Sequence, residues 1–126
     1  MKESVLLTRA SLLSALLFSV HVTHDLVLGF DKAGPQNLTV VAILLVWVCA
    51  TLLLAERRSG HALVLLASIF AAAMPILHLR SLNGEFARRE GALLFLWTLF
   101  ALGTSGLFGA ILAVRALVKR GVEAPG

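Results

Sequence analysis

Four long apolar blocks, separated by short polar runs, are the feature that most restricts how this chain can fold. The blocks extend over 6–30, 38–55, 62–79 and 92–114. A helix needs about 20 mostly apolar residues to cross the hydrocarbon core of a bilayer. The apolar residues form continuous runs rather than one-sided stripes, which indicates membrane helices. The sequence therefore predicts an all-α protein, a four-helix transmembrane bundle that runs up-down-up-down as a single domain over 1–126.

The composition agrees with a membrane protein. The chain is 59% hydrophobic and 14% charged, whereas a soluble domain carries about 25% charged residues. The single cysteine, Cys49, excludes an intramolecular disulfide and is expected to be a buried thiol. The net charge is +4, but the basic residues stand in short runs at the ends of the blocks. Such runs set membrane topology, so we expect the lipid bilayer as partner and no nucleic acid.

The distribution of Lys and Arg predicts the orientation. Four spans place both termini and the turn at 56–61 on one side of the membrane. That side carries seven of the eleven Lys and Arg residues, and the other side carries four. Positive residues favour the cytoplasmic side. We therefore expect both termini in the cytoplasm and the protein in a bacterial cytoplasmic membrane.

Ionisable residues stand inside two of the apolar blocks. His21, His24 and Asp25 lie in the first block, and His78 lies near the end of the third. Ionisable groups at this depth are costly, and by default they indicate a functional site. The predicted topology places all four in the outer half of the membrane. Three imidazoles and a carboxylate suit a transition metal such as Zn, Cu or Fe, with Asp25 as a ligand or as the group that orients His21.

Haem is a second ligand that these residues suggest. His24 and His78 belong to different predicted helices, so the two imidazoles are expected to be able to ligate a haem iron from both faces. In either form, the first hypothesis is a redox or metal-linked membrane protein with a His/Asp site in the outer leaflet.

Proton or ion movement is an alternative hypothesis. His21 and Asp25 are four residues apart and share one face of a helix, and Ser14 continues the same line toward the cytoplasm. The three side chains are candidates for a proton relay in a small transporter. Phe18 interrupts the line between Ser14 and His21, which counts against a continuous path.

A second alternative is a scaffold without catalytic activity. Small residues on one side of the fourth block let another helix approach closely; they are Gly103, Gly106, Gly109 and Ala110. This face predicts a homo-oligomer or an accessory subunit of a larger membrane complex. In that case the His21–Asp25 pair has only a structural role. The sequence contains no complete set of catalytic residues, so a non-enzymatic protein is favoured over an enzyme.

Overall fold

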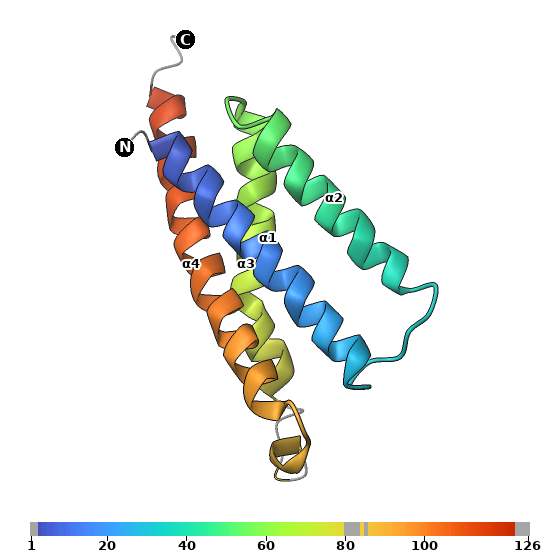
Figure 1. Cartoon of the computed structure of the whole chain (residues 1–126). Coiled ribbons are helices and arrows are strands. Elements are labelled where there is room, and N and C mark those ends of the chain that lie inside the picture. Colours follow the sequence, from blue (N-terminus) through green and yellow to red (C-terminus); the bar gives the residue numbers. More distant parts are fainter. Residues whose placement is uncertain (1–2, 80–83, 85, 123–126) are drawn as a thin grey trace.

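The computed structural model describes residues 3–79, 84 and 86–122, which form four α-helices, a short 3-10 helix and no strand. The elements are α1 (Glu3–Val27), α2 (Asn37–Leu53), α3 (Arg58–His78), η2 (Phe86–Arg88) and α4 (Ala92–Val122). Consecutive α-helices run in opposite directions (Figure 1). The start of α1, the α2–α3 turn and the end of α4 lie together at what we call the terminal end. The end of α1, the end of α3 and the start of α4 lie at the opposite end. The prediction of an all-helical chain is confirmed.

Three of the four helices are long and apolar enough to cross a membrane. The three candidate segments are Glu3–Val27, Arg58–His78 and Ala92–Lys119. The remaining helix, α2, is apolar but has only 17 residues. At 1.5 Å per residue it extends about 26 Å, slightly less than the ~30 Å hydrocarbon core of a typical bilayer. The length criterion is therefore met by three of the four predicted spans.

The end of α1 is set by a glycine. The helix was expected to continue to Phe30 but ends at Val27. Gly29 adopts a left-handed conformation with φ of 69°, and the amide of Phe30 donates a hydrogen bond of 2.8 Å to the carbonyl of Asp25. This bond closes the helix as in a Schellman motif and satisfies a carbonyl of the last turn.

The start of α3 differs from the prediction. The polar turn was expected to extend to His61, but α3 begins at Arg58 and His61 is only 3% exposed. Gly60 makes this possible, because a Cβ atom at this position would collide with the carbonyl oxygen of Leu54. The first turn of α3 can therefore lie directly against the end of α2, which moves His61 into the interior.

The last helix continues beyond its apolar block. α4 was expected to end near residue 114 but extends to Val122. The additional turns of α4 lie beside the start of α1. There Glu3 forms ion pairs with Arg115 at 3.4 Å and with Lys119 at 2.6 Å. These pairs connect the first and last helices at the terminal end.

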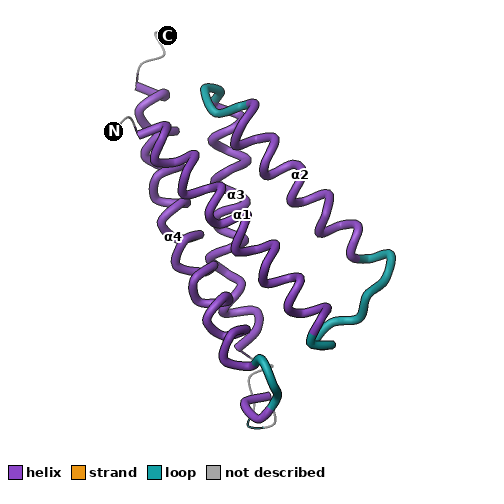
Figure 2. Tube along the Cα trace, viewed as in Figure 1, coloured by secondary structure: helices purple, strands orange, loops and turns teal. Residues whose placement is uncertain are grey.

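The helices differ in how much of their surface they bury. α3 and α4 share the most extensive contact, α1 packs across both, and α2 lies at the outside (Figures 1 and 2). Only three residues of α2 are buried: Trp47, Ala50 and Thr51. Cys49 is exposed, so the prediction of a buried thiol is wrong. The reason is helical phase, since Cys49 lies on the side of α2 opposite the face that contacts the other helices.

Candidate functional site

The polar line predicted on α1 faces the other helices. Ser11, Ser14, Phe18 and His21 are almost completely buried, and Asp25, one turn beyond His21, is 17% exposed. Their spacing of three and four residues keeps them on one face of the helix. The end of α3 approaches this face and brings His78 beside the last two of these residues.

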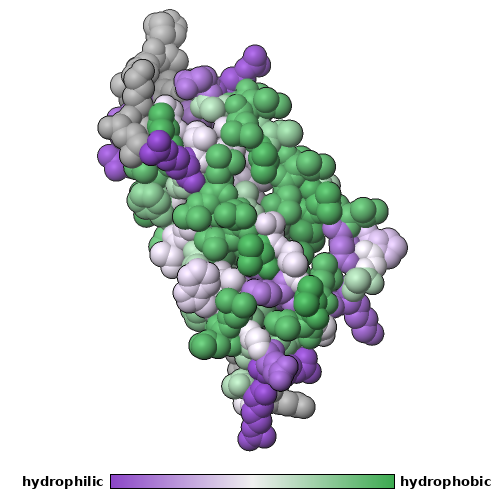
Figure 3. All heavy atoms as spheres, in the orientation of Figure 1, coloured by the Kyte–Doolittle hydropathy of each residue, from purple (hydrophilic) through white to green (hydrophobic). Residues whose placement is uncertain are grey.

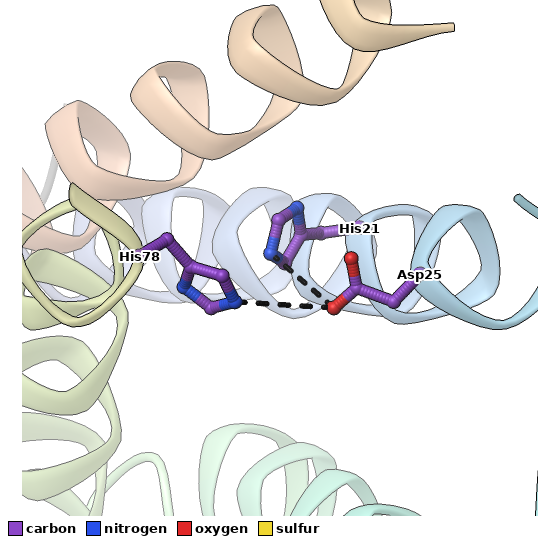
Figure 4. Close-up of side chains that lie close together, drawn as sticks. All are labelled: His21, Asp25 and His78. Atoms are coloured by element: carbon purple, nitrogen blue, oxygen red, sulfur yellow. Dashed lines mark ion pairs between the residues drawn. The ribbon is translucent and has the colours of Figure 1, made fainter. Parts of the chain in front are cut away.

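A cluster of three groups forms where α1 and α3 meet at the opposite end of the molecule. The Oδ2 atom of Asp25 lies 3.8 Å from Nε2 of His21 and 4.0 Å from Nε2 of His78 (Figure 4). One ligand atom from each of the three residues lies within 4.8 Å of the others. Two imidazoles and one carboxylate therefore converge on a single small volume.

Aromatic side chains surround one side of this cluster. The ring of Phe95, from α4, lies 4.8 Å from the ring of His21 and 5.7 Å from that of His78, measured between centroids. The two imidazole rings meet edge-to-face at 5.2 Å. Phe30 and Phe86 pack on Phe95 at 5.1 and 5.2 Å. These contacts lower the local polarity and restrict the orientation of both imidazoles.

The hydrogen bond of His78 determines which of its nitrogen atoms carries a proton. Nδ1 lies 3.0 Å from the carbonyl oxygen of Met74. Because a carbonyl can only accept, Nδ1 must be the protonated nitrogen. In the neutral imidazole Nε2 then presents a lone pair to the carboxylate of Asp25. The two acceptors face each other at 4.0 Å, so a species that interacts with both lone pairs, such as a proton, a water molecule or a metal ion, suits the space between them.

Other polar atoms of the site are also without hydrogen-bond partners. Among the described residues, these buried atoms include both ring nitrogens of His21, Oδ1 of Asp25 and Nδ1 of His24. A buried polar atom without a partner costs about 1–3 kcal/mol. Several such atoms around one point indicate a site that is completed by a bound species.

His24 and a haem fit the geometry less well than His21, Asp25 and His78. His24 lies outside the group of three converging residues. A haem iron bound to Nε2 of His78 would need a wide, flat space in front of that atom. The side chains of Asp25 and His21 occupy the space there. The arrangement therefore favours a single ion over a porphyrin.

The third relay candidate, Ser14, is separated from the cluster. Its hydroxyl lies 3.0 Å from the hydroxyl of Ser105 on α4. Phe18 lies between Ser14 and His21 on the buried face of α1, and its ring contacts Trp47 and Phe70 at 6.0 and 5.5 Å. This apolar layer interrupts the polar line at the position where the sequence suggested an interruption.

The small-residue face of α4 is occupied within the chain. A Cβ atom at Gly103 would meet the ring of Pro75, at Gly106 the backbone of Ala72, and at Gly109 the hydroxyl of Ser68. Ala110, next to them, is partly buried. These glycines bring α4 close to α3, so the face that suggested a partner chain is covered by the protein itself.

Two buried polar features were not singled out from the sequence. The indole Nε1 of Trp47 donates to the hydroxyl of Ser11 at 2.9 Å, and this hydroxyl lies 2.7 Å from that of Thr51. His61 is buried nearby at the terminal end. The contact of Trp47 and Thr51 with Ser11 could have been predicted, because Trp47 and Thr51 stand one helical turn apart in an apolar block. His61 gave no signal, because it follows a polar run.

A comparison of this chain with protein-family models, with curated proteins and with solved structures found no significant match. The function must therefore be inferred from the site itself.

Proposed function

We propose that this chain is a small integral membrane protein that binds one divalent transition-metal ion through His21, Asp25 and His78. The ion would lie near the non-cytoplasmic surface, with both termini in the cytoplasm. The single observation that carries the proposal is the hydrogen bond from His78 Nδ1 to the Met74 carbonyl, because it directs a lone pair of His78 toward Asp25.

The surface supports a membrane location. Large apolar side chains are exposed along the middle of all four helices, among them Leu16, Leu45, Leu66 and Leu107. On the face shown in Figure 3, apolar side chains dominate the middle and hydrophilic ones gather toward the ends. Soluble monomers rarely expose continuous apolar surface of this extent. A bilayer would cover it without requiring a partner protein.

The donor set supports a first-row divalent ion. Zn²⁺ binds imidazole nitrogen and carboxylate oxygen at about 2.0–2.2 Å, which places tetrahedral ligand atoms about 3.3 Å apart. The present separations of 3.8 and 4.0 Å from Asp25, with all three ligand atoms within 4.8 Å of one another, would shorten to this value by rotation of the side chains. Two imidazoles and a carboxylate, without a thiolate, suit Zn²⁺, Fe²⁺, Co²⁺ or Ni²⁺ better than Cu⁺.

The remaining contacts of His78 resemble those of metal-binding histidines. Such residues usually donate the N–H of the other ring nitrogen to a carbonyl or carboxylate, which fixes the tautomer. The carbonyl of Met74 has this role here. Three protein ligands leave a coordination position for water or a small ligand, and Asp25 and His78 are partly exposed, at 17% and 27%. The bound ion would therefore exchange with the outer solution.

Cobalt and zinc binding to the purified protein test the proposal. In mild detergent, we expect one Zn²⁺ per chain and a visible Co²⁺ absorption band that Zn²⁺ removes. His78→Gln, His21→Gln and Asp25→Asn should each lower the affinity by at least about a hundredfold, because each removes a ligand. His24→Gln is the matched control, since it removes a nearby imidazole outside the cluster. Affinity should fall as the pH falls, because protons compete for the same atoms.

Two results would contradict metal binding. One is a wild-type protein that is folded and monodisperse but takes up neither ion. The other is an equal loss of affinity in His24→Gln and His78→Gln. In the first case the cluster is a polar contact between α1 and α3 rather than a metal site.

A further inference from the structure

A second buried histidine lies far from the proposed metal site. His61, in the first turns of α3, is 3% exposed, and neither ring nitrogen has a hydrogen-bond partner. It is 17 residues from His78 on the same helix, which corresponds to about 26 Å along the axis. The two sites therefore lie at opposite ends of the molecule.

A small cavity adjoins this histidine. Its volume is about 10 Å³, and its polar lining comes from the side chains of Ser4, Thr8, Ser11, Thr51 and His61. A cavity of roughly 10–15 Å³ accommodates the centre of one water molecule, and such a water needs two to four polar partners. The lining supplies that number.

Three of the hydroxyl groups around the cavity, those of Thr8, Ser11 and Thr51, have already used their protons. Thr8 donates to the carbonyl of Ser4 at 2.9 Å, and Thr51 donates to that of Trp47 at 2.8 Å. Since the only proton of Thr51 is used, Ser11 must donate in the 2.7 Å bond between the two hydroxyls. These three groups therefore offer lone pairs to the cavity and no donors. The fitting occupant is a molecule with protons to donate.

A surface groove lies next to two of the residues that line the cavity. The groove has a volume of about 230 Å³ and is lined by Ser4, Val5, Thr8, Arg9 and Glu56. Ser4 and Thr8 line both the groove and the inner cavity. Both residues are partly buried, so they form a shared wall between the solvent-facing groove and the cavity beside His61.

We propose that the groove, the Ser4–Thr8 pair and the cavity form an access route by which water and protons reach His61 from the terminal end. One water molecule in the cavity donates to the lone pairs of the hydroxyls and contacts a ring nitrogen of His61. A proton passes from the groove through this water to the imidazole, and the reverse transfer returns it to solvent. No covalent bond other than O–H and N–H bonds is formed or broken.

The charged groups at this end come from each neighbouring element. The lining of the cavity has no charged side chain other than His61 when it is protonated. From α1, Arg9 lies in the groove together with Glu56 of the α2–α3 turn. Arg57 and Arg58 precede His61 along the chain. From α4, Arg115 and Lys119 are paired with Glu3.

Proton exchange between the His61 ring and water tests the route. The full-length protein is labelled with ¹⁵N-histidine and placed in lipid nanodiscs, and exchange is measured by NMR. The chain has four histidines, so the variants of His21, His24 and His78 assign the His61 signal even if His61 itself cannot be replaced. We expect magnetisation transfer from water to the His61 ring, and exchange at least tenfold slower in Thr8→Val.

Thr23→Val is the matched control. Thr23 is on the same helix and makes the same bond to the carbonyl four residues earlier, at 2.8 Å, but it is exposed and far from the cavity. In Thr23→Val the His61 ring should exchange protons with water at the wild-type rate. Absence of water contact at His61 would show that the cavity is dry and would overturn the proposal. Equal rates in Thr8→Val and the wild type would also overturn it, because water would then reach His61 by a path that does not involve Thr8. Equal slowing in both threonine variants would have the same meaning, because the effect would then not depend on the route. Metal binding is unaffected by either result.

Discussion

At the scale of single residues, two separate sets of polar groups lie in the interior of the described chain. One set is His21, Asp25 and His78 at the opposite end. The other is the Trp47–Ser11–Thr51 network with His61 at the terminal end. The first set has atoms without partners that face one another. In the second set the hydrogen bonds among Trp47, Ser11 and Thr51 satisfy the network, and the ring nitrogens of His61 beside it have no partner. The first is therefore suited to binding, and the network is suited to holding α1 against α2.

A substitution in the network measures its contribution to stability. Ser11→Ala removes the acceptor of the Trp47 indole and the donor to Thr51, both in a buried position. Hydrogen bonds between membrane helices contribute about 0.6 kcal/mol on average and up to about 1.7 kcal/mol. We expect a loss of about 1 kcal/mol in the free energy of unfolding, measured by denaturation in mixed detergent micelles. Ser19→Ala is the control, since the hydroxyl of Ser19 makes an exposed hydrogen bond to the carbonyl of Leu16 within α1. Equal stability of the two variants would contradict a structural role for the network.

At the scale of the helices, the closest approach is between α3 and α4. Gly106 lies where a Cβ atom would come within 2.6 Å of the Ala72 amide nitrogen and 2.7 Å of the Ala71 Cβ. These are rigid atoms that cannot rotate away, so any side chain at this position must separate the two helices. The glycine face therefore has a packing function within one chain.

A single added methyl group tests this contact. Gly106→Ala should lower the free energy of unfolding by about 1–3 kcal/mol, the usual cost of overpacking a close contact. Gly121→Ala, on the same helix, has no atom within 4 Å of its added Cβ. It should leave stability unchanged or raise it by less than about 1 kcal/mol, because alanine favours a helix over glycine. If Gly106→Ala instead leaves unfolding unchanged and dissociates an oligomer, the face contacts a partner chain.

At the scale of the whole molecule, the proposed orientation rests on charge and on the antiparallel course of the helices. The start of α1 and the end of α4 lie at the same end (Figure 1). The basic residues at that end are Arg9, Arg57, Arg58, Arg115 and Lys119 of the described chain. This arrangement supports the proposal of a cytoplasmic terminal end and a metal site that faces outward.

Reporter fusions test the orientation. A green fluorescent protein fused after Gly126 should be fluorescent in bacterial cells, and alkaline phosphatase at the same position should be inactive, because each folds on one side of the membrane only. A fusion in the turn between α1 and α2 should give the reverse pattern. Phosphatase activity after Gly126 would place the termini outside and the metal site on the cytoplasmic side.

The sequence by itself determined the helical class and much of the site on α1. Apolar runs bounded by polar turns predict helices, because in a helix the backbone groups of each run are satisfied within the run. The face of a helix on which a residue lies is also determined locally, since 3.6 residues per turn place His21 and Asp25 on one face. For the same reason the buried line of Ser11, Ser14 and Phe18 could be predicted without knowledge of the other helices.

The tertiary structure decided which helices meet and at what height along their axes. These properties depend on contacts between residues far apart in the sequence, and periodicity carries no information about them. Only the docking of α3 on α1 brings His78 to His21 and Asp25. Only the contact of α4 with α3 shows that the glycine face is covered. His61 was missed for this reason too, because the close approach of Gly60 to Leu54 is what moves the residue after a polar turn into the interior.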